Sequence, residues 1–200
     1  MNDKIRDLLG QIAALEEQLK LTLLAQENRI IFQIRGKRVE FDKDVRAAHA
    51  RLKRKVLRWL VTDRPQNLLT GPIIYFMIIP MLLLDLTVSL YQALSFPIYR
   101  IASVPRADYI VFDRHQLGYL NFYERVHCEY CAYASGLLAY ASEIVARTEQ
   151  YFCPIKHARR VLGTHARYRD FLEYGEAEDY HGRLEQFRTA LEMEARKRSA

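Results

Sequence analysis

The chain has 200 residues, of which 50% are hydrophobic, and its 30 Lys and Arg exceed its 24 Asp and Glu to give a net charge of +6. This composition, with only 8 Gly and 6 Pro, excludes a disordered or collagen-like chain. The positive charge permits anionic lipid, nucleic acid or acidic protein as a partner. The first residues lack the apolar core of a secretory signal, so we expect the N-terminus to stay in the cytosol.

Residues 1–29 predict an amphipathic helix. Its apolar residues recur at spacings of three and four, at Ile5, Leu8, Ile12, Leu15 and Leu19. This spacing is typical of a helix that pairs with another helix in a coiled coil. The same stripe also fits a helix that packs on the protein's own domain. A homo-oligomer and an intramolecular contact therefore both remain open.

Residues 30–66 predict a short β-hairpin followed by a basic amphipathic helix. Apolar residues alternate at period two on either side of Gly36, which indicates two strands joined by a turn. Helical spacing returns after Asp42, with many basic residues on the polar faces. Such a helix beside an apolar segment suits anionic headgroups, so we prefer lipid to nucleic acid as its partner. The candidate lipid-binding residues are Arg51, Lys53, Arg54, Lys55, Arg58 and Trp59.

Residues 67–100 predict a membrane segment. Between Arg64 and Arg100 the only charged residue is Asp85. The stretch from Pro72 to Leu94 is long enough for one span of the hydrocarbon core, which needs about 20 residues. A buried helix of a soluble domain is the alternative.

Two residues disturb a simple span. Asp85 is a candidate polar site within the membrane, because a carboxylate is costly in lipid unless it is neutral or paired. Pro80 removes a backbone donor and favours a kink. Basic residues follow on both flanks, so a re-entrant hairpin broken near Pro80 competes with a single span. We prefer the arrangement with both flanks in the cytosol.

Residues 101–200 predict a small helical metal-binding domain. The three cysteines of the chain lie in a pattern of Cys128-x2-Cys131, a spacer of 21 residues, and Cys153-Pro-Ile-Lys-His157. Thiolates separated by two residues in a turn can point at one ion, and Cys153 and His157 lie one helical turn apart. We therefore expect a structural zinc site of three cysteines and one histidine, with iron or an iron–sulfur centre as the alternative.

This site requires a particular arrangement of helices. A turn has to carry Cys128 and Cys131, a helix has to cover residues 135–150, and another helix has to begin at Pro154. Free thiols, or a disulfide between the first two cysteines, are alternatives, and His127 is a second choice for the fourth ligand in place of His157. The odd number of cysteines indicates a reducing compartment.

The remaining features do not form a catalytic set. Glu143, Arg147 and Glu149 are candidate acid, base or supporting residues, although a helix-surface salt bridge explains Glu143 and Arg147 more simply. A last amphipathic helix is predicted from Asp179 through Leu191. The sequence contains no phosphate-binding loop, His-Glu-x-x-His helix or nucleophile elbow.

Four stretches carry a resemblance to other proteins. They are Asp-Tyr-Ile-Val-Phe-Asp-Arg-His (108–115), Tyr-Leu-Asn (119–121), Cys-Glu-Tyr-Cys (128–131) and Arg-Thr-Glu-Gln-Tyr-Phe-Cys-Pro-Ile-Lys-His (147–157). With them, residues 68–180 resemble a group of uncharacterised bacterial membrane proteins. The resemblance implies a bacterial origin and no mechanism.

Together these features predict a mainly α-helical protein attached to the bacterial inner membrane, with its N-terminus and metal domain in the cytoplasm. We expect a zinc-binding adaptor or scaffold without catalytic activity, whose partners are the lipid bilayer and other proteins or a second copy. A membrane-associated electron carrier with iron at the same ligands is one alternative. A zinc hydrolase, with water replacing His157 and Glu143 or Glu149 as base, is the other.

Overall fold

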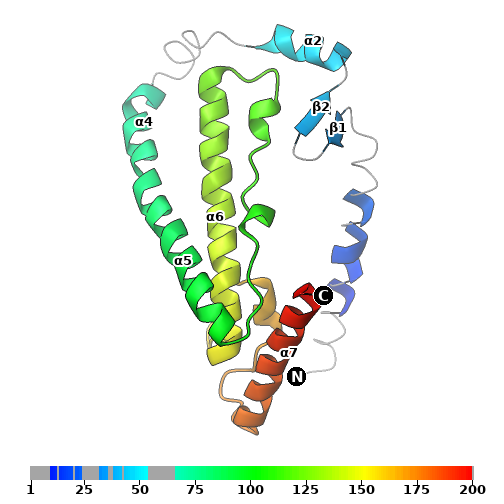
Figure 1. Ribbon diagram of the computed structural model, residues 1–200, viewed down its shortest axis with the longest axis vertical. Coiled ribbons are helices and arrows are strands. Elements are labelled where there is room, and N and C mark those ends of the chain that lie inside the picture. Colours follow the sequence, from blue (N-terminus) through cyan, green and yellow to red (C-terminus); the bar gives the residue numbers. More distant parts are fainter. Residues whose placement is uncertain are drawn as a thin grey trace. The chain divides into compact units, whose positions relative to one another are not determined.

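The computed structural model describes residues 10–12, 14–19, 21–23, 32–35, 38–41, 43–53 and 66–199. In this part of the chain helices predominate (Figure 1). The chain divides into a first unit, Met1–Arg54 with Gln116–Leu120, and a second unit, Lys55–His115 with Asn121–Ala200. The predicted membrane segment and the C-terminal region therefore belong to one compact unit.

The first unit contains the N-terminal helix. Residues 10–23, apart from 13 and 20, are helical. Ile12, Leu15 and Leu19 of the apolar stripe are at least 50% exposed, so nothing in the described part of the unit covers them. The first two members of the stripe lie outside the described residues, namely Ile5 and Leu8.

A hairpin and a helix follow in the first unit. Strand β1 (Phe32–Arg35) pairs antiparallel with β2 (Arg38–Phe41), and the two strands flank the predicted turn. Helix α2 (Lys43–Leu52) comes next. Of the candidate lipid-binding residues, Arg51 and Lys53 are exposed. The others lie outside the described residues: Arg54, Lys55, Arg58 and Trp59.

The apolar stretch forms one long helical segment in the second unit. Helix α4 (Gln66–Phe76) and helix α5 (Ile78–Ile98) are interrupted only at Met77, whose carbonyl still accepts from the amide of Met81 at 3.3 Å. Pro80 lies in the first turn of α5, where its missing N–H is tolerated. The chain does not reverse there (Figure 1). The predicted re-entrant hairpin is therefore wrong.

Helix α6 (Phe122–Phe152) is the centre of the second unit. Its first turn is closed by a capping box, in which the Asn121 side chain accepts from the Glu124 amide at 3.0 Å and Glu124 accepts from the Asn121 amide at 2.8 Å. Residues 99–115, which we call the return segment, run antiparallel to α6. Successive positions of the segment contact successively earlier positions of α6: Ala102 contacts Arg147, Tyr109 contacts Gly136, and His115 contacts Glu129.

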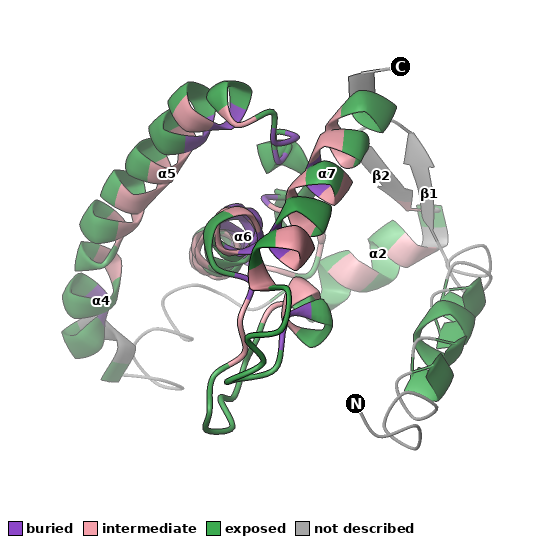
Figure 2. Ribbon diagram, turned by 90° about the horizontal axis from the view of Figure 1, so that it is seen from below, coloured by how far each residue is buried: buried purple, intermediate pink, exposed green. Residues whose placement is uncertain are grey.

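Helix α6 runs parallel to α4–α5 and contacts it along its length. The contacts occur in the same order on both helices, as Tyr75–His127, Asp85–Tyr133, Gln92–Tyr140 and Tyr99–Phe152. The side of α4–α5 that faces away from α6 is exposed (Figure 2). Phe96, Leu137 and Ile144 are fully buried between the helices and the return segment. This contact forms the hydrophobic core of the unit.

The predicted helix over residues 135–150 is confirmed as part of α6, but the turn predicted before it and the helix predicted after it are wrong. Helix α6 continues through Cys128 and Cys131, where a turn was expected, and ends at Phe152 with Cys153 as its C-cap. Beyond it the chain is extended, and Ile155 forms a parallel bridge with Leu172, so no helix begins at Pro154. The physical reason is a stripe of side chains that faces α4–α5 on both sides of the expected turn, where it packs against Tyr75 and then enters the core. Its members beside Tyr75 are Tyr123, His127 and Tyr130. Its buried members are Tyr133, Leu137, Tyr140 and Ile144.

The last predicted helix is confirmed. Helix α7 (Tyr180–Ser199) follows a 3-10 turn, Ala166–Asp170, and packs on α6 through its buried Leu184 and Leu191. The helix begins one residue after the predicted start at Asp179 and continues eight residues beyond Leu191. The helix thus closes the side of the core next to the end of α6.

Gly136 allows the return segment to cross α6 at close range. A Cβ atom here would clash with the carbonyl oxygen of Tyr109 and lie 3.0 Å from Cα of Ile110, both backbone atoms. We expect Gly136→Ala to lower the free energy of unfolding by about 1–3 kcal/mol, the usual cost of overpacking. Urea unfolding followed by circular dichroism measures this loss. The control is Gly71→Ala, whose Cβ makes an ordinary 3.4 Å contact with Tyr123, and equal losses would contradict the close crossing.

Candidate functional site

The four predicted metal ligands lie in two separate places. Cys128 and Cys131 lie near the beginning of α6, whereas Cys153 caps its C-terminus and His157 follows in the extended segment. The length of helix between Cys128 and Cys153 is about 37 Å at about 1.5 Å per residue. Zinc binds its ligands at about 2.0–2.3 Å. The predicted four-ligand site is therefore not assembled, and the described residues contain no other group of three or more suitable ligands.

These side chains have local partners or surroundings instead. The His157 ring stacks on Tyr168 with 6.1 Å between centroids, and the His157 amide donates to the Tyr168 hydroxyl at 2.6 Å. The Nδ1 of His127 lies 2.8 Å from the Tyr75 hydroxyl. Burial raises the pKa of the Cys128 thiol, which disfavours the thiolate that a metal needs. All three cysteines are free thiols, so the alternative disulfide is not formed.

Metal removal should therefore leave the fold unchanged. We expect the melting temperature of the full chain to be the same before and after treatment with a zinc chelator. Cys128→Ser and Cys153→Ser should keep the wild-type circular dichroism spectrum, since neither thiol helps to bind a shared ion. Thermal unfolding with elemental analysis of the purified chain checks both points. One tightly bound zinc per chain, with unfolding on chelation, would contradict the separation of the ligands.

Asp85, the charged residue in the apolar stretch, points inward and is paired. Arg106 of the return segment donates from Nε to both carboxylate oxygens at 3.1 and 3.2 Å and from Nη2 at 2.6 Å. Tyr133 of α6 donates its hydroxyl at 2.9 Å, and Ser89 donates at 3.4 Å. The hydrogen bond to Asp85 raises the pKa of Arg106, and burial raises the pKa of the Tyr133 hydroxyl. The partner that this carboxylate requires is thus supplied by the chain itself.

Gln92 provides a second polar contact two turns along α5. Its Oε1 accepts from the Val104 amide at 2.6 Å, and its Nε2 donates to the Val104 carbonyl at 3.3 Å and to the Tyr140 hydroxyl at 3.1 Å. The side-chain amide therefore satisfies a buried backbone unit of the return segment. We call this whole set of hydrogen-bonded residues the polar seam: Asp85, Ser89, Gln92, Val104, Arg106, Tyr133 and Tyr140.

Arg106→Gln should destabilise the second unit, because it leaves the Asp85 carboxylate without its charge partner. We expect a loss of about 1–3 kcal/mol in the free energy of unfolding, below that of a fully buried pair since the Arg106 side chain is 46% exposed. Arg100→Gln is the matched control. The Arg100 side chain is 73% exposed and 3.7 Å from Glu192, so its loss should stay below about 0.5 kcal/mol. Urea unfolding in mild detergent compares the two, and equal losses would contradict the role of the seam.

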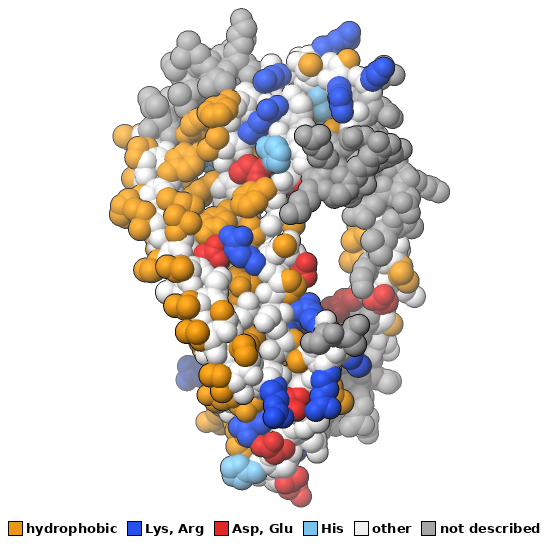
Figure 3. Space-filling model, in the orientation of Figure 1, with side chains coloured by type: hydrophobic (Ala, Val, Ile, Leu, Met, Phe, Trp, Pro, Cys, Tyr) orange, Lys and Arg blue, Asp and Glu red, His pale blue; other side chains and the backbone are white. Residues whose placement is uncertain are grey.

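The outward side of α4–α5 is apolar and exposed. From Leu69 to Ile98 the mean hydropathy is 2.2, and the segment is long and apolar enough to cross a membrane. None of its most apolar 18 residues is buried. Figure 3 shows hydrophobic side chains gathered over α4 and α5. We call this surface the apolar face, and its large members are Leu69, Ile73, Ile74, Phe76, Met77, Ile79, Leu82, Leu83, Leu86, Leu90, Leu94 and Ile98.

The few polar groups on the apolar face are satisfied internally. Among the exposed residues from 72 to 98, only Thr87 and Tyr91 have polar side-chain atoms. The Thr87 hydroxyl donates to the carbonyl of Leu84 at 3.0 Å, and the Tyr91 hydroxyl lies 3.0 Å from the hydroxyl of Thr148. A surface that enters an apolar environment needs this, because an unpaired polar group is costly there.

A second charged cluster joins α6, the 3-10 turn and α7. Arg167 donates to Glu143 at 3.1 Å and to Glu194 at 2.9 Å. Burial alone would lower the pKa of Arg167, but the hydrogen bond and charge of Glu194 and the charge of Glu143 raise it. The hydrogen bond from Arg167 lowers the pKa of Glu194. The hydrogen bonds of Arg167 therefore link three elements of the unit.

The candidate acid and base residues belong to such structural pairs. Glu143 accepts from Arg147 at 2.8 Å as well as from Arg167. Glu149 lies 2.8 Å from Nε2 of His165. The predicted salt bridge between Glu143 and Arg147 is thus present, and the Arg147 side chain is only 7% exposed rather than on the surface. These contacts support packing of the unit.

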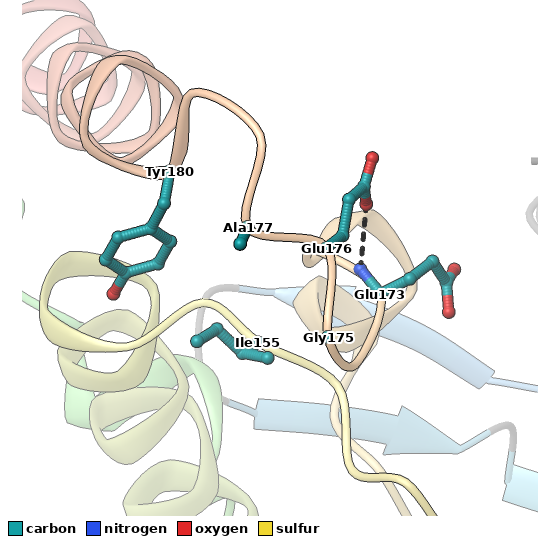
Figure 4. A pocket seen from close by; sticks show the side chains of 6 residues that line it. All are labelled: Ile155, Glu173, Gly175, Glu176, Ala177 and Tyr180. Atoms are coloured by element: carbon teal, nitrogen blue, oxygen red, sulfur yellow. Dashed lines mark hydrogen bonds between the residues drawn. The ribbon is translucent and has the colours of Figure 1, made fainter.

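An open pocket of about 290 Å³ lies beside the loop that precedes α7 (Figure 4). Its carboxylates already have partners: Glu173 accepts from Lys156 at 2.7 Å, and Glu176 accepts from Arg183 at 2.6 Å. In Figure 4 both carboxylates point away from Ile155. The pocket therefore offers a small apolar hollow without an available acid or base. Its lining residues are Ile155, Glu173, Gly175, Glu176, Ala177 and Tyr180.

Comparison with protein-family models, with curated proteins and with solved structures finds no match to this chain. Its own surfaces therefore carry the functional argument. Sequence reasoning identified Asp85 as a residue that needs a partner, and it missed Arg106, Gln92 and Tyr133. The signal available in the sequence was Asp85 alone, because its partners come from segments whose placement depends on the tertiary fold.

Proposed function

We propose that this protein is a membrane-attached helical adaptor or scaffold without catalytic activity. The observation that carries the proposal is the apolar face of α4–α5, which lies exposed along the whole helix while the opposite side is fastened to α6. Large exposed apolar surfaces of soluble chains mark sites of membrane or protein interaction. An apolar stretch of this length and hydropathy favours lipid.

Zinc is not part of this proposal. The adaptor with zinc, the electron carrier and the zinc hydrolase all relied on ligands that include Cys128, Cys131 and Cys153. These thiols lie at the two ends of α6. The carboxylates that the hydrolase would need, Glu143 and Glu149, already pair with cationic or histidine side chains. The adaptor role needs none of these groups.

The water-facing parts of the chain supply the surfaces for partners. The N-terminal helix exposes Ile12, Leu15 and Leu19 on one stripe, which fits a coiled-coil contact with a partner helix or a second copy. The net charge of +6 and the exposed Arg51 and Lys53 suit the anionic cytoplasmic surface of a membrane. Free thiols and the resemblance noted above are consistent with the cytoplasmic side of a bacterial inner membrane.

Flotation with vesicles of phosphatidylcholine and phosphatidylglycerol tests the attachment. We expect the full chain to float with the vesicles and Leu83→Glu to bind at least about tenfold more weakly, since the variant loses a leucine that would be buried in lipid and adds a charge. Leu162→Glu is the matched control, because Leu162 is 83% exposed and lies outside the apolar face. Failure of the wild-type chain to float, or equal weakening in both variants, would refute the attachment.

Cross-linking on membranes tests the adaptor part. We expect Leu15→Glu with Leu19→Glu to remove cross-links from the N-terminal helix to a second copy or to a partner protein, because charges would enter the helix contact. The same variant should still float with vesicles. Unchanged cross-linking would show that the stripe is not a contact surface. Loss of flotation would assign it to the membrane instead.

A further inference from the structure

We propose that α4–α5 lies in the plane of the membrane, with the apolar face in one leaflet, and does not cross the bilayer. This inference rests on the membrane attachment proposed above and adds how the helix is oriented. Both ends of the helix, and the chain on either side of it, then stay in the same compartment.

Helix α6 accompanies α4–α5 along the apolar stretch. The two helices are in contact near the start of the apolar stretch, at its middle and at its end, through Tyr75, Asp85 and Tyr99 respectively. Any depth in the bilayer that α4–α5 reached would therefore be reached by α6 as well. Helix α6 carries charged residues in its first and last thirds, and it is not among the described helices that are apolar enough to span a membrane. These charged residues are Glu124, Arg125, Glu129, Glu143, Arg147 and Glu149.

The return segment places charged residues beside the middle of α4–α5. Asp85 lies near the middle of the stretch from Leu69 to Ile98, and its partner Arg106 is 46% exposed at that level. Asp108 follows two residues later and is also exposed. If the helix spanned the membrane, this irregular, charged segment would lie at the bilayer centre. Lipid does not tolerate exposed irregular backbone or unpaired charge there.

The two sides of α4–α5 differ in polarity. The polar seam takes up Asp85, Ser89 and Gln92 on the side toward α6, and the other side exposes only apolar groups and two internally bonded hydroxyls. Figure 2 shows the exposed side turned away from α6 along both helices. A helix with one apolar side and one side bound to a polar domain suits the interface between lipid and water, where the apolar side contacts acyl chains.

Lipid fits this surface better than a second copy does. At about 100° per residue, the exposed positions from Leu82 through Leu94 to Ile98 cover an arc of about 160°. A partner helix packs on a narrower stripe, whereas acyl chains surround the whole arc. The net charge of +6 also complements anionic headgroups. Arg100, 73% exposed, directly follows the helix at the edge of the apolar face.

Thiol labelling of the full chain tests the orientation. The chain is made in a cell-free reaction with preformed vesicles of phosphatidylcholine and phosphatidylglycerol, and a membrane-impermeant maleimide is then added outside. One single-cysteine variant keeps only the exposed native Cys153, which follows Phe152 beside the end of α5. In the others all native cysteines are serine, and the single thiol comes from Gln66→Cys at the start of α4 or from Leu83→Cys on the apolar face.

We expect the thiols at both ends, Cys153 and that of Gln66→Cys, to be labelled to the same extent as in detergent, and that of Leu83→Cys to be at least about tenfold less labelled until detergent is added. Labelling of one end only would show a spanning helix and overturn the inference while membrane attachment stands. If the chain does not float and Leu83→Cys is labelled freely, the proposed attachment itself fails. If it does not float and Leu83→Cys is protected, a second copy covers the face.

Trypsin digestion of the unmodified chain on the same vesicles provides a readout without any substitution. Arg51 precedes α4, and Arg159 and Arg160 lie exposed in the loop after α6. We expect cleavage at both places from outside. Protection of one of them until detergent is added would overturn the in-plane arrangement.

Discussion

The carboxylate of Asp85 sits in the middle of an apolar helix, and its need for a partner governs how the second unit is built. An unpaired carboxylate in apolar surroundings costs several kcal/mol, so a fold that contains it has to bring a cation and donors to it. Arg106 and Tyr133 meet this need from two different segments. The return segment is thereby held against α5, and α6 then descends beside α5 in the same direction.

The same pairing separates the two sides of α4–α5. The charged and amide side chains are collected in the seam against α6, so the other side is left with apolar side chains and the two internally bonded hydroxyls of Thr87 and Tyr91. The surface that results is too apolar for water and is backed by a domain too charged for the interior of a bilayer. In the in-plane arrangement that we propose, the boundary between lipid and water satisfies both sides at once. The same proposal leaves the rest of the second unit and the N-terminal helix in the aqueous phase, where other proteins can bind them.

The cysteine pattern shows how a spacing rule can mislead. A pair such as Cys128 and Cys131 can bind one ion together with distant ligands when a turn carries it. In a continuous helix, the pair is instead held far from Cys153. Here an apolar stripe running from Tyr133 to Ile144 and a capping box at Asn121 and Glu124 make α6 continuous. Both signals are local and were present in the sequence. They outweigh the spacing because they concern every turn of the helix, whereas the spacing concerns four residues.

Local periodicity and composition were sufficient for the N-terminal helix, the hairpin, the apolar segment and the last helix, because each depends on neighbours a few residues apart. Asp85 was recognised as a residue in need of a partner for the same reason. The sequence alone did not decide which partner it found, because Arg106 and Tyr133 approach it only after the chain has turned back along α6. Nor did it decide that one side of the apolar stretch packs on the rest of the unit while the other side stays exposed. That distinction depends on which face the rest of the chain covers, and only long-range packing determines it.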